Sequence, residues 1–146
     1  LSPHAPYSVD PAVAADLARL AAERDLRLHT HLGESAMEDA LYDRGVRTVL
    51  DVFGDLRDEY VLVREGGRGL KAVPYAASLG LICPRCHVAH GVYLDRAQRD
   101  LLLANGTQVV LCPRSNAVIG LDEAPVADYL REGHEIAVST DSLASC

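Results

Sequence analysis

The chain alternates between short apolar runs typical of β-strands and longer stretches whose apolar residues recur at helical spacing. Strands are predicted at five places, one ending at Ser2 and the others at residues 26–31, 86–93, 107–111 and 135–139. Helices are predicted at residues 10–24, 35–53, 95–104 and 125–131. Strand, loop, helix and strand in repeated order indicate βαβ units around a parallel sheet. The sequence therefore predicts an α/β fold.

Boundary residues support this assignment. Asp10 is the predicted N-cap of the first helix, and Pro11 takes the first helical position, where proline is tolerated. Closely spaced glycines predict a loop between residues 55 and 77, and a short helix is predicted near residues 73–78. No turn between a strand and a helix carries Gly-x-Gly-x-x-Gly, which argues against a dinucleotide-binding fold.

Polar residues suited to hydrolytic chemistry lie at or just beyond the C-terminal ends of the predicted strands. They are His4, His31, Glu34, His90, Asn116 and Asp141. A (β/α)8 barrel keeps its active site on this face, because the carboxyl ends of all its strands meet there. Five strands are too few to close an eight-stranded barrel. We therefore expect a partial (β/α)8 TIM barrel with parallel strands and crossover helices.

Composition narrows the function classes. The 146 residues suffice for one domain, and the net charge of −7 comes from acids and bases that are mixed along the chain. Without a basic stripe or a set of aromatic residues, nucleic-acid binding is not expected. No apolar run approaches the roughly 18 residues of a membrane span. We expect a cytoplasmic protein that binds a small-molecule substrate, with a homodimer as its expected assembly.

Five segments, taken in chain order, resemble the amidohydrolase superfamily. They are residues 2–7 (SPHAPY), 29–34 (HTHLGE), 89–94 (AHGVYL), 112–116 (CPRSN) and 139–145 (STDSLAS). The similarity is to the branch that contains cytosine, guanine and S-adenosylhomocysteine/aminofutalosine deaminases and triazine chlorohydrolases. It implies that residues 1–146 form the C-terminal portion of a catalytic barrel, strands four to eight. The first strands and any β-sandwich domain would then be absent, as the abrupt ends of the chain also suggest.

The resemblance implies one divalent metal ion, with zinc expected ahead of iron. His31 and Asp141 match two of the family's ligands, and His29 is expected to lie one layer deeper in the barrel. The other two ligands belong to a His-x-His motif on the first strand, outside this chain. Because catalytic zinc usually has three or more protein ligands, residues 1–146 alone are expected to be inactive.

The resemblance also implies a mechanism of hydrolytic deamination. The metal would bring the pKa of bound water from about 16 to about 7. Asp141 would accept the proton of this water, His90 would orient it, and Glu34 would protonate a ring nitrogen. The residues expected to contact the substrate are His4, Ser115 and Asn116. The favoured substrate is an adenine nucleoside such as aminodeoxyfutalosine or S-adenosylhomocysteine; a chlorohydrolase or another amidohydrolase, acting on a triazine or a free base, is the alternative.

Two other hypotheses remain open. Residues 83–87 read Cys-x-x-Cys-His, which is the attachment motif of c-type haem and also half of a zinc site. A zinc site would need two further ligands, yet Cys112 and Cys146 are distant in sequence, so reduced thiols are expected. The second hypothesis is a truncated module without catalytic activity. The presence of Glu34, His90 and Asp141 argues against it.

Overall fold

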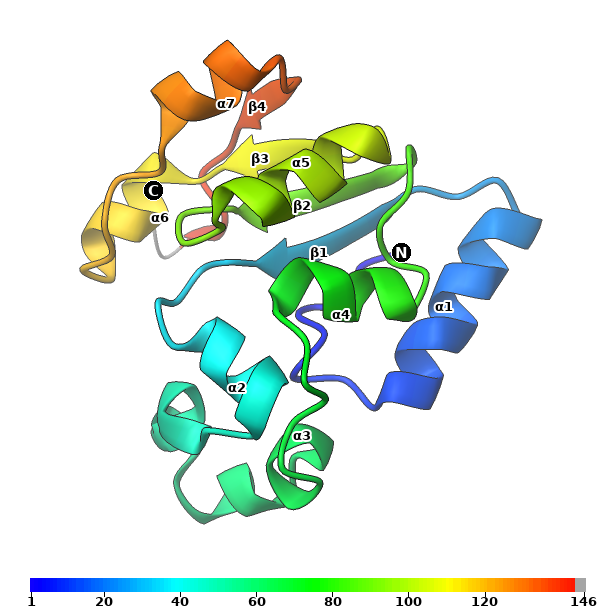
Figure 1. Ribbon diagram of the computed structural model, residues 1–146, viewed down its shortest axis with the longest axis vertical. Helices are drawn as coiled ribbons and strands as arrows, with labels where there is room; N and C mark the ends of the chain where they lie inside the picture. The colour runs from blue at the N-terminus through cyan, green and yellow to red at the C-terminus, as the bar shows by residue number, and fades with distance from the viewer. Residues whose placement is uncertain (144–146) are drawn as a thin grey trace.

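The computed structural model describes residues 1–143, without the side chains of residues 49, 50, 52, 53 and 57. Its centre is a sheet of four parallel strands in the order β1-β2-β3-β4 (Figure 1). The strands are β1 (Leu28–Leu32), β2 (Cys86–His90), β3 (Gln108–Leu111) and β4 (Ile136–Val138). Sequential neighbours pair throughout, as the predicted βαβ units require.

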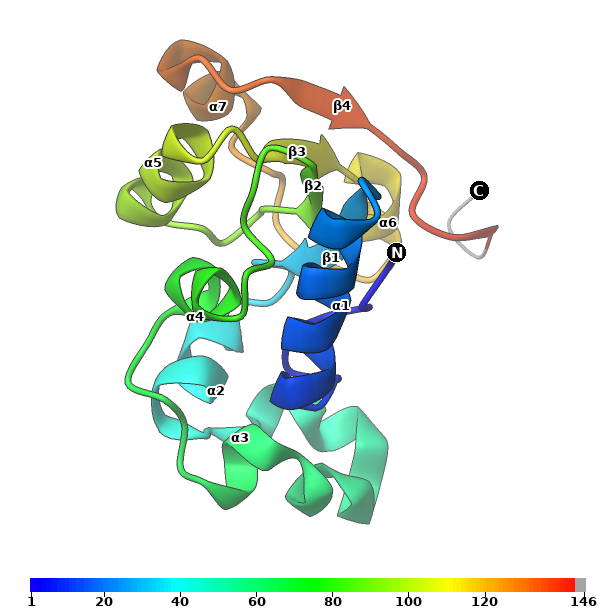
Figure 2. The same ribbon diagram turned by 90° about the vertical axis from the view of Figure 1, so that its right-hand side faces the viewer.

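Helices connect the strands. In chain order they are α1 (Pro11–Glu23), α2 (Glu38–Arg44), the 3₁₀ helix η1 (Arg47–Glu59), α3 (Val61–Arg64), α4 (Ala72–Ser78), α5 (Arg96–Ala104), α6 (Pro113–Val118) and α7 (Val126–Glu132). Figure 2 shows α4, α5 and α7 along one side of the sheet. No helix within the described part of the chain has the length and apolarity needed to cross a membrane.

The hydrophobic core lies between the helices and one face of the sheet. Alternate strand residues point into it, among them Leu28, Leu32, Val88, Val109 and Leu111. The residues between them point to the opposite face, and His31 is one of these. The core thus fixes which side chains each strand presents to the site.

Several predicted boundaries are confirmed. The Asp10 carboxylate accepts a hydrogen bond from the Ala12 N–H at 2.8 Å, so it caps α1 as expected. The short helix predicted near residues 73–78 corresponds to α4. The helix predicted at residues 35–53 is wrong in extent, because α2 ends at Arg44 and the next residue, Gly45, has a φ of 67° that stops the helix.

The prediction of a strand ending at Ser2 is wrong, since the first residues are assigned to no strand. They nevertheless follow the edge of β1. The carbonyl oxygens of Leu1 and His4 accept hydrogen bonds from the N–H groups of His29 and His31 at 2.9 and 2.8 Å. Pro3, between them, has no N–H to complete a ladder. The described residues therefore contain four strands where five were predicted.

Candidate active site

Three predicted site residues meet at the carboxyl ends of the strands. His31 lies in β1, His90 ends β2, and Asp141 follows β4 by three residues. One potential ligand atom from each lies within 4.8 Å of the other two. Among residues 1–143 this is the one such cluster of three. Segments separated by more than a hundred residues thus converge as the barrel pattern predicts.

His90 reaches the cluster through an unusual backbone conformation. It pairs in register with Leu32, so simple alternation would turn its side chain toward the helices. Its φ is 71°, in the left-handed region that non-glycine residues seldom adopt. The imidazole instead lies with its ring centre 5.2 Å from that of His31. Asp141 also has a positive φ, 69°. Such strain is typical of functional sites.

Hydrogen bonds orient both imidazoles. The Nδ1–H of His31 donates to the His4 carbonyl at 2.9 Å, and the Nδ1–H of His90 donates to Asn116 Oδ1 at 3.0 Å. Each Nε2 therefore carries its lone pair toward the cluster. His90 Nε2 is buried without a hydrogen-bond partner. Metal-binding histidines are held in this way, so the donor set fits a divalent ion.

The Asp141 carboxylate completes the cluster. Its Oδ1 lies 3.4 Å from His31 Nε2, and its Oδ2 accepts a hydrogen bond from the Ser115 hydroxyl at 2.8 Å. Burial acts to raise the pKa of Asp141. The hydrogen bond from Ser115 and the neighbouring His31 and His90 outweigh this effect, and the pKa of Asp141 lies below its usual range. The group is therefore an anion at neutral pH.

Glu34 lies at the rim of the cluster. Its Oε1 is 3.7 Å from His90 Nε2, which is too long for a hydrogen bond. The side chain is partly exposed, whereas the His90 ring is fully buried. A carboxyl group thus faces the same space as the cluster while keeping access to solvent. The structure brings together the four residues to which catalytic or metal-binding roles were assigned; the roles themselves stay predictions.

The three residues predicted to contact substrate differ in placement. Ser115 and Asn116 are buried, and their side chains hold Asp141 and His90 through the hydrogen bonds above. His4 is exposed, with its ring centre 4.8 Å from that of His31. Partial desolvation of the ring and the neighbouring His31 lower the pKa of His4, so its ring is mainly neutral at neutral pH. Of the three, His4 is open to a ligand; substrate contact stays a prediction for all of them.

Three buried polar residues around the site were not predicted. Thr30 donates its hydroxyl to the carbonyls of Pro3 and His4, and Tyr129 donates to the Gly91 carbonyl at 2.6 Å. Glu38 accepts a hydrogen bond from the Glu34 N–H at 3.0 Å. For Glu38 a signal was present, because residues 35–38 read Ser-x-x-Glu, the capping-box pattern.

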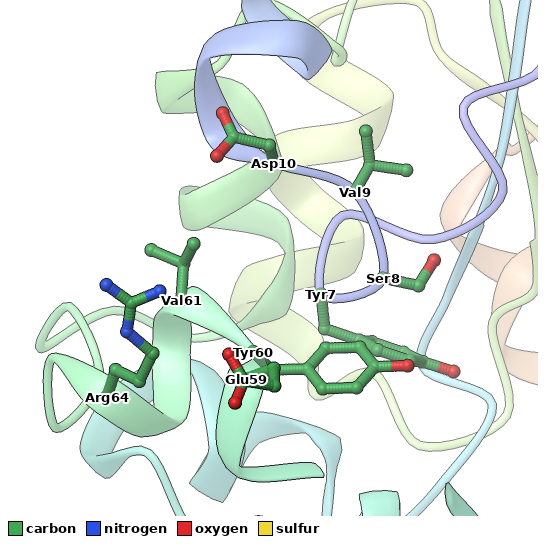
Figure 3. Close-up of a pocket in the computed structure, with 8 residues that line it drawn as sticks. All are labelled: Tyr7, Ser8, Val9, Asp10, Glu59, Tyr60, Val61 and Arg64. Atoms are coloured by element: carbon green, nitrogen blue, oxygen red, sulfur yellow. The ribbon is translucent and has the colours of Figure 1, made fainter. Parts of the chain in front are cut away.

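The cavities bordered by the described residues include two that lie outside the cluster. One, of about 310 Å³, lies between the start of α1 and α3, where Tyr7, Tyr60 and Arg64 line it (Figure 3). The other, of about 290 Å³, is mainly apolar and borders Asn116 between β4 and the α6–α7 segment. Neither includes a residue of the three-residue cluster among its described lining residues.

The Cys-x-x-Cys-His segment lies at the amino end of β2, where Cys86 begins the strand, and the cluster lies at its carboxyl end. Burial raises the pKa of the Cys86 thiol to about 12, which disfavours the thiolate that zinc requires. Cys83, Cys86 and Cys112 are free thiols, and Cys146 lies outside the described residues. The described residues place no third metal ligand beside this pair.

Comparison with known sequences gives a match over the whole chain. The amidohydrolase family matches residues 1–146. The chain is 34% identical over 145 residues to a 5-methylthioadenosine/S-adenosylhomocysteine deaminase of Nitratidesulfovibrio vulgaris (strain Miyazaki F), covering 99% of this chain and 28% of that protein. A protein of the same name from Bacillus cereus (strain B4264) is 32% identical over the same lengths. The chain spans little more than a quarter of these relatives.

Comparison with solved structures agrees on the fold. An adenosine deaminase from Xanthomonas campestris with bound zinc gives a TM-score of 0.75 at 28% identity, covering 99% of this chain and 28% of that one. The zinc complex of an atrazine chlorohydrolase from Arthrobacter aurescens gives 0.76 at 23% identity, with 99% and 27% covered. At that identity the second likeness shows the fold alone. The predicted α/β partial barrel is confirmed.

Proposed function

The chain belongs to the amidohydrolase family, as its five ordered motifs predicted, and from that premise we propose that it carries part of the active site of a metal-dependent deaminase. The proposed substrate is an amino-substituted heterocycle. An adenine nucleoside is the first candidate, because the similar proteins from two bacteria are named as 5-methylthioadenosine/S-adenosylhomocysteine deaminases. Zinc is the proposed metal, since the similar adenosine deaminase was solved with zinc bound.

The convergence of His31, His90 and Asp141 is the observation that carries the proposal. Both imidazole Nε2 lone pairs face the ionised carboxylate across a few ångströms, and hydrogen bonds behind each ring hold that orientation. Without a cation this arrangement brings three electron-rich atoms together. It is therefore a suitable place for a positive ion.

Each residue of the cluster has a distinct proposed task. A divalent ion held by His31 and Asp141 would supply a water that ionises near neutral pH. His90 Nε2 would accept a hydrogen bond from this water and orient its oxygen toward the ring carbon. Asp141 Oδ1 would accept the water's proton, while the Ser115 hydroxyl holds Oδ2 in place. The same oxygen then passes the proton to the amino nitrogen that leaves.

Glu34 acts on the ring in this scheme. Its carboxyl donates a proton to the ring nitrogen beside the carbon under attack, so the electrons displaced from the ring do not build up negative charge. The water oxygen bonds to that carbon, the bond to the amino nitrogen breaks, and ammonia leaves. The proton that remains on this oxygen returns to the Glu34 carboxylate, so the ring carbon carries a carbonyl group in the product and Glu34 regains its proton. The partial exposure of Glu34 beside the buried His90 supports this role.

The test uses the protein expressed from its complete reading frame and loaded with zinc. Adenosine, 5-methylthioadenosine and S-adenosylhomocysteine are assayed for ammonia release, and atrazine is assayed for chloride release. Ammonia release that falls at least a hundredfold in Glu34→Gln and Asp141→Asn would support the proposal. Chloride release without ammonia release would favour the chlorohydrolase alternative, and no turnover of any of the four would reject both.

A further inference from the structure

Glu38 is a buried acid that the proposed reaction does not use. It is the first residue of α2, and the residue is 1% exposed. Its Oε2 accepts the Glu34 N–H at 3.0 Å, whereas Oε1 is buried without a hydrogen-bond partner. No ion pair of the described residues includes Glu38. One carboxyl oxygen is thus committed to the backbone of Glu34.

Capping of α2 does not account for this burial. Ser35 Oγ accepts the Met37 N–H at 3.2 Å, and the Ser35 carbonyl accepts the Glu38 N–H at 3.1 Å, so the start of the helix already has partners. A capping-box glutamate can perform its task at an exposed position. A carboxyl without a counter-charge is costly to bury, more so than a helix cap returns. The free-energy cost of burying Glu38 therefore indicates that this residue has a role other than capping α2.

The loop on the other side of this hydrogen bond carries Glu34. It leaves β1 at Leu32 and is held first by the Gly33 carbonyl, which accepts the Tyr93 N–H at 2.9 Å. Its next anchor is the Glu34 N–H on Glu38. The Glu34 side chain itself approaches His90, with its Oε1 3.7 Å from His90 Nε2. Its direction therefore depends on how firmly its backbone is fixed.

We propose that Glu38 is a positioning residue, whose buried carboxyl fixes the Glu34 backbone and so aims the Glu34 side chain at the substrate. The role of Glu34 in this statement rests on the proposed function. The anchoring does not, because it is a contact within this chain. The position of a proton donor must be fixed closely, since a displacement of about 1 Å can lower the rate about a hundredfold.

Anchoring is tested first, without reference to activity. In the protein expressed from its complete reading frame, Glu38→Met removes the acceptor at similar size, and Glu38→Gln keeps an acceptor oxygen. Glu23→Met, at an exposed glutamate of α1, is the matched control. Hydrogen exchange of the Glu34 amide should accelerate at least tenfold in Glu38→Met and remain near wild type in the other two. Equal exchange in all four proteins would overturn the anchoring. If Glu38→Met does not fold, Glu38→Asp takes its place, with the same acceleration expected because the shorter side chain withdraws the acceptor.

Action through Glu34 is tested by a double-mutant cycle. Glu38→Met should lower kcat about a hundredfold with KM changed less, and Glu38→Gln should restore most of it. In a Glu34→Gln background the same change should cost under threefold, because the side chain being aimed is already inactive. An equal loss of kcat in both backgrounds, or a loss of bound zinc in Glu38→Met, would reject the positioning role. Either result would mean that Glu38 only stabilises the fold. If the wild-type protein has no activity, the proposed function fails. The hydrogen exchange of the Glu34 amide then tests by itself whether Glu38 anchors the Glu34 backbone.

Discussion

A single amide orients the most buried histidine of the site. Asn116 Oδ1 accepts the Nδ1–H of His90 at 3.0 Å, which directs Nε2 into the cluster. Asn116→Leu keeps the volume but removes the acceptor, so we expect turnover to fall about 10- to 100-fold in a steady-state assay. Asn105→Leu is the control, because the Asn105 side chain donates to the Leu101 carbonyl on α5. Equal turnover in both variants would contradict this role.

The acidity of Glu38 predicts a pH dependence of folding. Burial raises its pKa from 4.5 to about 8, against the opposing effect of the backbone N–H groups of Gly33, Glu34 and Ser35 near the carboxyl. Between these values the folded chain keeps a proton that the unfolded chain releases. Stability is therefore greatest below the lower value and declines as pH rises toward the higher one, by at most about 1.4 kcal/mol per pH unit.

Glu38→Gln cannot ionise, so it should remove this decline. The free energy of unfolding of each protein is measured by urea denaturation at about pH 5 and about pH 8. Wild type should lose stability relative to Glu38→Gln over that interval. Other titrating groups, such as His4 and His29, are present in both proteins and drop out of the difference. A difference that is constant with pH would contradict the raised pKa.

Sequence patterns predicted where individual residues lie when strand position alone decides it. His31 and Asp141 follow from strand ends, since parallel strands deliver their carboxyl ends to one edge. The approach of His90 depends on its φ of 71°, and strand alternation gives no sign of that. The burial of Glu38 depends on the packing of α2. The capping-box pattern predicts where a helix starts, but it does not predict that the Glu38 side chain is buried.

At the scale of elements, the turn after β2 joins the site to α7. Gly91 has a φ of 60°, and a Cβ there would lie 2.5 Å from the Tyr129 hydroxyl oxygen. Gly91→Ala should therefore destabilise folding by about 2 to 4 kcal/mol, from backbone strain plus displacement of Tyr129. Gly120→Ala is the matched control, with a φ of 75° and open space around its Cβ. It should cost about 1 kcal/mol, and urea denaturation of both variants checks the difference.

Element boundaries were predictable where a local residue enforces them. Asp10 starts α1, and Gly45 ends α2 within the stretch that apolar spacing alone extended to residue 53. The edge segment at Ser2 was not separable from a strand by pattern, because its carbonyls do meet β1 while Pro3 prevents a ladder. Helix α6 begins at Pro113 within a segment that the motifs marked only as a site loop.

At the scale of the whole molecule, the cluster draws on both ends of the described chain. His31 precedes Asp141 by 110 residues, so a ligand shared between them would tie β1 to the segment after β4. An ion that binds the folded state alone stabilises it by about 2.7 kcal/mol at a hundredfold excess over its Kd. Zinc added to the chelator-treated protein should therefore raise Tm. Removal by chelator should reverse the rise.

Two matched substitutions test which residues bind the zinc that raises Tm. Asp141→Asn weakens one ligand of the cluster and should abolish most of the zinc-dependent rise in Tm. Cys83→Ser alters the segment at the opposite end of β2 and should leave the rise unchanged, because the buried Cys86 thiol beside it is a poor metal ligand. Differential scanning calorimetry with and without zinc compares the two variants. A rise that survives Asp141→Asn but disappears in Cys83→Ser would move the metal to the Cys-x-x-Cys-His segment, and with it the basis for assigning hydrolytic chemistry to the strand ends.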